Sequence, residues 1–244
     1  MPDHTSPSRG PLIAAILPTY NEELNVSGVL DVLRATEILD EIILVDDGSK
    51  DKTAEILNQA AAMDRRILVI QHDRNKGKGQ AIFSGLAATR ATIILLLDAD
   101  LKNLNPGHIQ ALLEPVIEHR ADMTLGLFRG GHFRTDASHW LTPFLTGQRG
   151  LRAELLKYVS HDAAGGYGFE VALTVAAHRH NSRTKVVPLK GVWHPSSEFR
   201  PERGYWNGRL MRLRMYGQII HAWVIATRER YPKAKAFFSS ISKS

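Results

Sequence analysis

The chain has 244 residues, 43% of them hydrophobic and 23% charged, and a chain of this length buries enough surface to fold around its own core. It contains no cysteine, which excludes a disulfide framework, a thiolate metal site and a cysteine nucleophile, and fits a reducing cytoplasm. Residues 1–11 lack the apolar stretch of a secretory signal, and no apolar run approaches the ~20 residues that span a bilayer. We therefore expect a cytoplasmic protein, at most peripheral to the inner face of the membrane.

The formal net charge of +6 is concentrated near the C-terminus. Residues 200–244 contain ten lysines and arginines and two glutamates, whereas residues 1–199 contain 21 basic and 23 acidic side chains. Residues 205–230 have the spacing of a basic amphipathic helix. If its arginines are exposed, we expect a peripheral membrane contact; if its apolar face packs on the protein, which we favour, the arginines face solvent or a soluble phosphorylated acceptor. No nucleic-acid-binding module is evident, so we expect no nucleic-acid partner.

The first half of the chain alternates short apolar runs with segments of helical spacing. The apolar runs predict five strands, at residues 12–17, 41–45, 67–71, 92–97 and 123–127. The intervening segments predict four helices, at residues 22–36, 52–63, 79–89 and 106–119. Because the strand runs are almost continuously apolar, we expect a mostly parallel sheet covered by helices on both faces. The predicted fold class is α/β.

Beyond residue 128 the pattern changes. A polar, glycine-rich stretch predicts a loop at residues 128–138, in which Arg129 and Arg134 are candidates for a lid over a diphosphate. Helical spacing returns at residues 151–159 and 169–180, and a further strand is expected at 185–189, followed by a loop at 190–204.

Polar residues follow each of the first four predicted strands. In a parallel sheet these strand ends meet at one edge, where ligands bind. Asp98 and Asp100 follow the fourth strand, and residues i and i+2 of an extended segment point the same way, so both carboxylates can face one divalent cation. Asp46 and Asp47 follow the second strand, where we expect one carboxylate to contact a base or ribose and the other to form an Asx-turn. Residues 76–79 (Lys-Gly-Lys-Gly) suggest either a phosphate-binding loop at a helix start or a solvated basic turn.

Four motifs in this order and spacing resemble those of family 2 glycosyltransferases: Pro18-Thr19-Tyr20-Asn21-Glu22, Val45-Asp46-Asp47-Gly48-Ser49, Asn75-Lys76-Gly77-Lys78-Gly79 and Leu97-Asp98-Ala99-Asp100. The resemblance covers residues 12–127 and implies a GT-A fold, a nucleotide-sugar donor and a Mg²⁺ or Mn²⁺ ion. It implies nucleoside contacts by Pro18, Tyr20, Glu22 and Asp47, and Asp100 as a direct metal ligand. Asp46, Lys76, Lys78 and Asp98 complete the expected donor-binding set.

The second half resembles more specific members of the family. Thr146-Gly147-Gln148-Arg149 is similar to the acceptor-side segment of dolichyl-phosphate mannose synthase-like enzymes, and Gly166-Tyr167-Gly168-Phe169-Glu170 to a segment beside the acceptor in those enzymes and in glucosyl-3-phosphoglycerate synthases. In the latter group a downstream histidine completes the metal site, which implies that His194 joins Asp98 and Asp100. Many polyprenyl-phosphate transferases have a long hydrophobic C-terminal segment that this chain lacks, a departure that argues against a lipid acceptor. The expected acceptor is a soluble phosphorylated molecule or polyprenyl phosphate.

The acceptor-side residues have alternative interpretations. Glu170 is a general base for the acceptor hydroxyl, an acceptor ligand or a helix cap. Arg149 either binds a phosphate or forms a structural ion pair, and Gln148 is expected beside the acceptor. His194 is either a metal ligand or a hydrogen-bonded surface histidine.

We therefore expect one GT-A domain over residues 1–244. It comprises a nucleotide-sugar-binding half (12–127), an acceptor-side half (128–204) and a basic helical tail (205–244). The expected reaction transfers a hexose from a UDP- or GDP-sugar to an acceptor hydroxyl or phosphate, with Asp100, Arg149 and Glu170 as catalytic residues. The alternatives are a non-catalytic nucleotide-sugar-binding module and a sugar-1-phosphate nucleotidylyltransferase.

Overall fold

A computed structural model describes residues 10–130, 146–159 and 168–195. The first two thirds of the described chain alternate strand and helix: β1 (Ile13–Thr19), α1 (Val26–Arg34), β2 (Glu41–Asp46), α2 (Thr53–Met63), β3 (Ile67–Gln71), α3 (Lys78–Ala87), β4 (Ile93–Leu96), α4 (Pro106–Ile117) and β5 (Met123–Arg129). The remainder consists of β6 (Arg149–Arg152), the 3₁₀ helix η2 (Ala153–Tyr158), α6 (Gly168–Arg179) and β7 (Thr184–Lys190). The predicted α/β class is confirmed.

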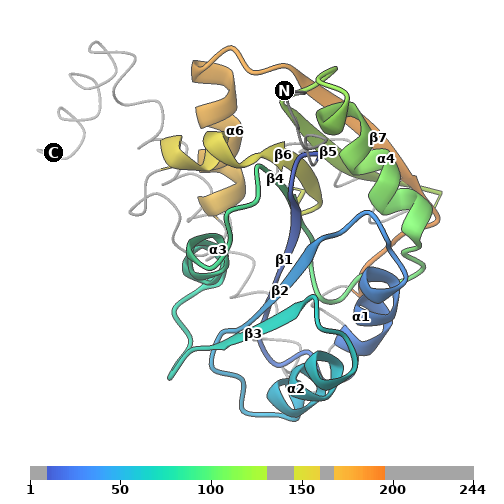
Figure 1. Ribbon diagram of the computed structural model, residues 1–244, viewed down its shortest axis with the longest axis vertical. Coiled ribbons are helices and arrows are strands. Elements are labelled where there is room, and N and C mark those ends of the chain that lie inside the picture. The colour runs from blue at the N-terminus through green and yellow to red at the C-terminus, as the bar shows by residue number, and fades with distance from the viewer. Residues whose placement is uncertain (1–9, 131–145, 160–167, 196–244) are drawn as a thin grey trace, which may run out of the picture.

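The strands form one sheet in the order β3-β2-β1-β4-β6-β5-β7 (Figure 1). Strands β3, β2, β1 and β4 are parallel, β6 runs antiparallel to both of its neighbours, and β5 pairs with β7 in parallel. After β1 the chain builds outward through β2 and β3, and it then returns to place β4 on the other side of β1. The sheet therefore reverses its strand order between β1 and β4, where a doubly wound sheet opens a crevice for a ligand.

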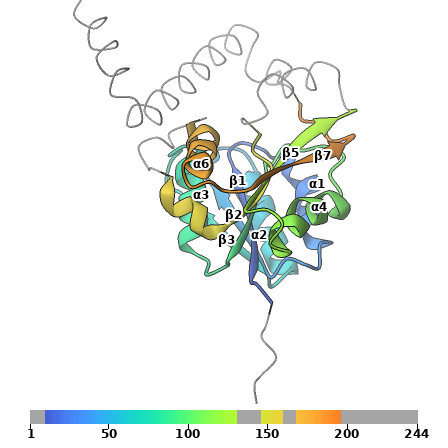
Figure 2. The same cartoon turned by 90° about the horizontal axis from the view of Figure 1, so that it is seen from above.

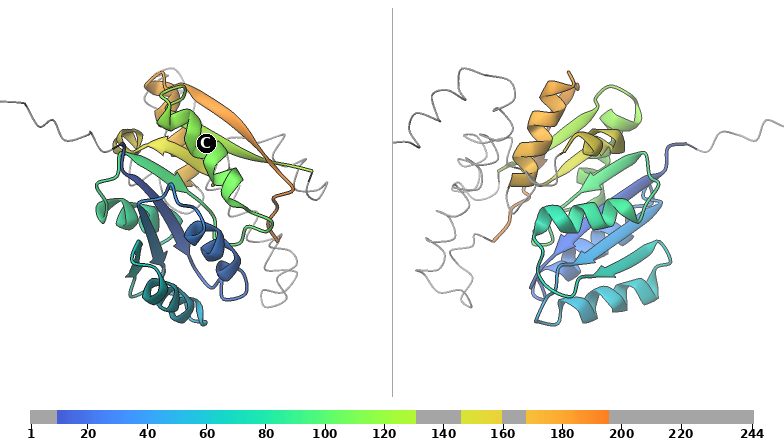
Figure 3. Two further views of the ribbon diagram at one scale, coloured as in Figure 1. Left: turned by 45° about the vertical axis from the view of Figure 1, so that its right-hand side comes forward. Right: turned by 90° about the vertical axis from the view of Figure 1, so that its left-hand side faces the viewer.

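Helices cover both faces of the sheet, and each face has its own hydrophobic core. Helices α1, α2 and α4 pack on one face against side chains such as Leu17 and Leu44. Helices α3 and α6 and the 3₁₀ helix pack on the other face against Ile16 and Ile43. Figure 2 shows these two helical layers on opposite sides of the sheet, and Figure 3 shows the same layers from the side. Alternate residues of β1 and β2 enter different cores, which explains why these strands are apolar at almost every position.

The second half differs from the sequence prediction at one element. Helical spacing predicts a helix over residues 151–159, whereas the structure has strand β6 followed by a 3₁₀ helix. The sequence does not predict this strand because Arg149–Arg152 is short and begins and ends with arginine. Its pairing with β4 and β5 is a tertiary interaction. The loop predicted at 128–138 begins two residues later, because Phe128 and Arg129 belong to β5. Residues 131–138 of that loop, residues 196–204 of the loop predicted at 190–204 and the tail at 205–244 lie outside the described residues.

Candidate functional site

Two loops at the carboxyl ends of β1 and β2 are joined by hydrogen bonds. The amide of Asn21 donates to Ser49 Oγ at 2.9 Å, and the amide of Lys50 donates to Asn21 Oδ1 at 2.8 Å. The amide of Glu22 donates to Thr53 Oγ1 at 2.8 Å. Asn21 has a φ of 54°, a conformation that asparagine adopts more readily than most residues. These bonds fix the first two predicted donor-binding loops relative to each other.

A cavity of about 600 Å³ opens beside these loops. Its lining comprises Tyr20, Asp46, Gly48, Ser49, Lys50, Ala54, Gln71, His72, Asp73, Arg74 and Asn75. A cavity of this size holds a small-molecule ligand, and it lies at the edge predicted for the nucleoside. Of the predicted donor-binding residues, Tyr20 and Asp46 line it.

The two carboxylates that follow β2 differ in what they bind. Asp46 Oδ1 accepts from the amide of Ser49 at 3.1 Å. Asp47 accepts from the amides of Lys76 and Gly77, each at 2.8 Å, and from His72 Nδ1 at 2.7 Å. Asp47 is 3% exposed, and its two oxygens order the loop after β3. Three protein donors therefore bind the Asp47 carboxylate, and its expected contact with the nucleoside stays a prediction.

The other predicted donor-side residues lie around this cavity without lining it. Pro18 is part of β1, where it pairs with Val45. The carboxylate of Glu22 accepts from Asn25 Nδ2 at 2.9 Å. Lys76 is exposed and forms an ion pair with Asp73 at 2.9 Å, so its ammonium group lies in the solvated part of the loop.

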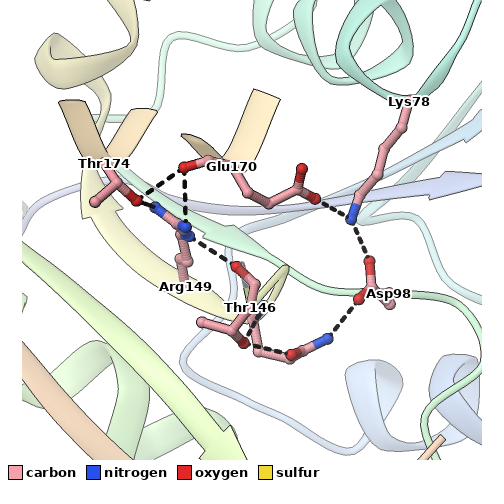
Figure 4. A network of polar contacts seen from close by, with 7 residues as sticks. Lys78, Asp98, Thr146, Arg149, Glu170 and Thr174 are labelled. Atoms are coloured by element: carbon pink, nitrogen blue, oxygen red, sulfur yellow. Dashed lines mark hydrogen bonds and ion pairs between the residues drawn. The ribbon is translucent and has the colours of Figure 1, made fainter. Parts of the chain in front are cut away.

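The centre of the site is a lysine held between two carboxylates (Figure 4). Lys78 begins α3, and its Nζ lies 2.6 Å from Asp98 Oδ1 and 2.6 Å from Glu170 Oε1. Asp98 follows β4 on the donor side, whereas Glu170 lies in the first turn of α6 on the acceptor side. The lysine therefore connects the two predicted halves of the site.

Charge explains how this cluster tolerates its partial burial. Burial opposes the charged form of Lys78, but attraction to Asp98 and Glu170 outweighs burial and raises the pKa of Lys78. Burial alone would raise the pKa of Asp98, yet the charge of Lys78 and its hydrogen bond lower it, with smaller contributions from His194 and Gln148. Lys78 and Asp98 are therefore both charged at neutral pH. Glu170 is 4% exposed, and its Oε2 is buried without a hydrogen-bond partner among the described residues.

The segment before β6 packs directly against the lysine and its carboxylates. Gln148 is 1% exposed, and its Nε2 donates to Asp98 Oδ2 at 2.6 Å. Its Oε1 accepts from Thr146 Oγ1 at 2.7 Å. A Cβ added to Gly147 would lie 2.6 Å from Asp98 Oδ2 and 2.8 Å from Lys78 Nζ. Only glycine permits this approach, and Gln148, expected beside the acceptor, instead fixes the donor-side aspartate.

Arg149 occupies a position different from the expected phosphate contact. It is 1% exposed. Its guanidinium donates to Thr146 O at 2.9 Å, to Glu170 O at 3.1 Å and to Thr174 Oγ1 at 3.1 Å. Burial lowers the pKa of Arg149 to about 10, against the opposing effect of Glu170 and Asp98, so it stays charged at neutral pH. These contacts favour the structural alternative, in which Arg149 joins β6 to the first turns of α6 (Figure 4), and phosphate binding by Arg149 stays a prediction.

The three predicted metal ligands come from two segments that the fold brings together. Lys102 and Trp193 form an antiparallel bridge, in which Lys102 N donates to Trp193 O at 2.8 Å. This bridge places His194 near Asp98, and the imidazole packs edge-on against Phe128 with 5.6 Å between ring centroids. Carboxylate and imidazole groups are suitable ligands for Mn²⁺ and, in the case of carboxylate, Mg²⁺.

The contacts of Asp98 narrow the set of side chains that would hold a metal ion. Both oxygens of Asp98 accept hydrogen bonds from protein donors. Within the described segments, no three His, Asp or Glu side chains are grouped closely enough to hold a metal ion. Asp100 and His194 therefore remain the ligands that the donor chemistry favours, and the metal site stays a prediction.

Three residues that contribute hydrogen bonds to the site were not predicted from the sequence. Thr174 and His72 belong to none of the motifs quoted above, and Thr146 appears there only as part of a motif. All three act through hydrogen bonds to groups far away in the sequence. A hydroxyl or imidazole on an otherwise ordinary segment gives no sequence signal of such a partner.

Comparison with known proteins decides the family. The family model described as glycosyl transferase family 2 matches residues 14–174. The chain belongs to glycosyl transferase family 2. This membership confirms the resemblance drawn from the four motifs, and with it the expected glycosyltransferase class.

Solved structures show that this family 2 chain has the GT-A fold of a known enzyme. Glucosyl-3-phosphoglycerate synthase from Mycobacterium tuberculosis, in complex with phosphoglyceric acid, has a TM-score of 0.71 and 25% identity, covering 89% of this chain and 80% of that chain. A complex of that enzyme with Mn²⁺, UDP-glucose and phosphoglyceric acid has a TM-score of 0.70 with the same identity and coverage.

Curated relatives of this family 2 protein include longer proteins. An undecaprenyl-phosphate 4-deoxy-4-formamido-L-arabinose transferase from Pseudomonas aeruginosa is 38% identical over 111 residues, which is 42% of this chain and 32% of that protein. The match thus spans about a third of that relative's length. An uncharacterised protein of Methanocaldococcus jannaschii is 26% identical over 216 residues, 79% of this chain and 85% of that protein.

Several expectations fall on parts of the chain that the structure does not describe. Arg134, Gly166, Tyr167 and the helix at 205–230 lie outside the described residues, and of the two lid candidates only Arg129, at the end of β5, is placed. Within the described segments, no helix combines the length and apolar content needed to cross a membrane.

Proposed function

We propose that this protein transfers a hexose from a nucleotide-diphosphate sugar to a phosphate-bearing acceptor. The observation that carries the proposal is the ion-paired group Asp98–Lys78–Glu170, in which one lysine joins a carboxylate of the donor loops to a carboxylate of α6. The donor and acceptor halves thus meet at one lysine, an arrangement expected of a protein that brings a donor and an acceptor together.

The donor half of the proposal is supported by the cavity and its loops. Tyr20 and Asp46 line a space of about 600 Å³ beyond the carboxyl ends of β1, β2 and β3, and the Asp47 carboxylate orders two amides of the adjoining loop after β3. The M. tuberculosis enzyme that shares the fold has been crystallised with UDP-glucose, which supports a nucleotide-sugar donor here.

The reaction would join an acceptor oxygen to the anomeric carbon and break the bond from that carbon to the diphosphate, which leaves with the electron pair. Lys78 and the more exposed Lys76 would stabilise the charge that develops on the leaving group. Glu170 Oε2, buried and without a described partner, would accept the hydroxyl proton or orient the acceptor through a hydrogen bond. An acceptor phosphate oxygen is already ionised and would need no base.

Asp100 and His194 would hold a divalent cation in this site. When bound, such an ion supplies positive charge to the leaving diphosphate. Complexes of the M. tuberculosis enzyme with Mn²⁺ or with Mg²⁺ and UDP support this assignment. Asp98 would then serve to position Lys78 rather than to bind the ion directly.

The acceptor proposal rests on two kinds of relative. The structural likeness to an enzyme crystallised with phosphoglyceric acid extends over 89% of this chain, whereas the relative named for undecaprenyl phosphate matches 42% of it. The longer likeness favours a soluble phosphorylated acceptor. Family membership also favours glycosyl transfer over the nucleotidylyltransferase alternative.

The test is release of nucleotide from UDP- and GDP-sugars, with Mn²⁺, Mg²⁺ or EDTA. It is run with 3-phosphoglycerate, with undecaprenyl phosphate in detergent, or without acceptor. The variants are wild type, Asp100→Ala and the matched control Asp31→Ala, whose carboxylate is 76% exposed on α1, away from the site. We expect metal-dependent release by wild type and Asp31→Ala, and at least a hundredfold loss in Asp100→Ala.

Circular dichroism must show that Asp100→Ala is folded. Full activity of this variant would overturn the metal assignment. Absence of both turnover and donor binding in wild type would overturn the transferase proposal.

A further inference from the structure

Three side chains from different elements form a hydrogen-bonded chain beside the donor cavity. His72 follows β3, and its Nδ1 lies 2.7 Å from Asp47 Oδ1. Its Nε2 lies 2.9 Å from Ser84 Oγ in α3. The side chains of His72 and Asp47 are 6% and 4% exposed. A carboxylate oxygen accepts, so Nδ1 donates to Asp47, while Nε2 shares the second hydrogen bond with the serine hydroxyl.

The carboxylate in this chain also holds the backbone of the loop after β3. Asp47 accepts from the amides of Lys76 and Gly77 at 2.8 Å each. Gly48, with a φ of +73°, lets the two loops approach closely, because an added Cβ would lie 2.5 Å from the Arg74 carbonyl carbon. The orientation of Asp47 therefore fixes where residues 76–77 lie and where α3 begins.

His72 fixes that orientation from both sides. Its backbone amide donates to Asp46 O at 2.9 Å, and Ser84 fixes the far side of the ring to the second turn of α3. Without His72, Asp47 would lose one of its three described donors, and α3 would lose a link to β3. Because His72, Arg74 and Asn75 all line the cavity, a shift of this loop changes the cavity itself.

The order Asp–His–Ser is also that of a nucleophilic triad. A nucleophilic serine needs nearby N–H groups that are free to stabilise an oxyanion. Ser84 lies inside α3 (Lys78–Ala87), where amides donate to the carbonyls of the helix itself. The geometry thus fits a structural link better than a nucleophile.

We propose that His72 is a positioning residue for the donor: it holds Asp47 so that the loop of residues 72–77 is in its donor-binding conformation before the donor arrives. The proposal rests on the proposed function, since it assumes that a nucleotide sugar occupies this cavity. Preorganisation of this kind lowers the conformational cost of binding. The expected effect of losing it is therefore on donor affinity.

Replacing His72 by asparagine or by glutamine tests the two hydrogen bonds of the imidazole ring separately. In His72→Asn the amide nitrogen stands near the position of Nδ1 and keeps the donor to Asp47. In His72→Gln the longer side chain stands near Nε2, towards Ser84, and the bond to Asp47 is lost. Ser84→Ala removes the hydrogen bond between Ser84 Oγ and His72 Nε2 and is the matched control for His72→Asn, which loses the same bond.

The probes are UDP and GDP with Mn²⁺, measured by isothermal titration calorimetry, together with hydrogen exchange of the Lys76 and Gly77 amides in the unliganded protein. We expect His72→Gln to weaken nucleotide binding about tenfold, the size associated with loss of a hydrogen bond to a buried charge. Exchange of the two amides should become faster. His72→Asn and Ser84→Ala should stay within about threefold of wild type.

Equal losses of nucleotide affinity in His72→Asn and His72→Gln would overturn the proposal. Losses of affinity that correlate with the loss of unfolding free energy in each variant would overturn it too. Unchanged binding and exchange in His72→Gln would overturn it while leaving the proposed function intact. Failure of the wild type to bind either nucleotide would overturn both.

Discussion

Lys78 in α3 and Glu170 in α6 are 92 residues apart in the chain, and their side chains form an ion pair with 2.6 Å between Nζ and Oε1. The same ammonium group binds Asp98 at the end of β4. One cation thus lies between two carboxylates and offsets the repulsion between them in a partly buried site. The geometry of both halves of the site depends on this lysine.

Removal of the shared cation should therefore cost both stability and activity. We expect Lys78→Met to lower the free energy of unfolding by about 2 kcal/mol, because it leaves two carboxylates without their counter-ion. The loss is smaller than for a fully buried pair because the side chains of Lys78 and Asp98 are each 28% exposed. Urea denaturation measures the loss, and nucleotide release measures turnover. The double variant Lys78→Met/Glu170→Gln should recover part of the stability but not the turnover; additive losses would contradict a shared ion pair.

Gly147 offers a test that leaves every charge in place. In Gly147→Ala the new methyl group would overlap Asp98 Oδ2 and Lys78 Nζ and push the ion pair out of position. We expect turnover to fall about a hundredfold, the effect of a displacement of about 1 Å at a reacting site. The control is Gly28→Ala in α1, where nothing lies within 4 Å of the added carbon and stability should rise slightly. Normal turnover in Gly147→Ala would mean that the ion pair can shift freely.

Arg149 distinguishes a positioning residue from a phosphate ligand. Its guanidinium binds two backbone carbonyls and Thr174, so Arg149→Met should lower the free energy of unfolding by about 3 kcal/mol. Thr174→Val, which removes one hydroxyl, should cost about 1 kcal/mol. Thermal and urea denaturation report these changes. A variant of normal stability with a raised KM for the donor would restore the phosphate-binding interpretation.

The pH dependence of stability should reveal the ion pair of Asp98. Its pKa is below the usual value in the folded protein, whereas an unfolded aspartate has a pKa of about 3.9. A group with a depressed folded pKa contributes stability above the unfolded pKa, and this contribution is lost as the pH falls through the folded pKa. We expect the stability advantage of wild type over Asp98→Asn to be constant above about pH 5 and to shrink below about pH 4. An advantage that persists unchanged to about pH 2 would contradict this origin.

The donor half of the fold follows closely from local sequence. The strand predicted at 67–71 is observed at Ile67–Gln71, and the other strands of this half agree to within two residues at each end. Their continuous apolar character is a direct result of burial on both faces. The helix predicted from residue 22 begins at Val26, because Glu22 O accepts from the amides of Asn25 and Val26 in a preceding turn.

The acceptor half could be predicted less well, for a physical reason. Strand β6 has only four residues, and Arg149 in it would ordinarily indicate an exposed position. It is buried because Glu170 O and Thr174 on α6 accept its hydrogen bonds. Such partners are set by tertiary packing, so the motif could identify Arg149 as important without revealing what it binds. The ion pair between Lys78 and Glu170 also depends on tertiary packing. The motifs therefore identify both residues as parts of the site but do not predict that they contact each other.

The antiparallel strand β6 has a consequence for protein engineering. It pairs Arg149 with Leu96, two residues before Asp98, so the segment that carries Gln148 shares a backbone ladder with the strand that delivers the donor-side carboxylate. In a chimera, a β6 segment taken from a relative would have to pair with the parent's β4. A change in that pairing would displace Asp98, which follows β4. A chimera with altered acceptor preference should therefore keep residues 146–152 from the parent and place its junction after Arg152.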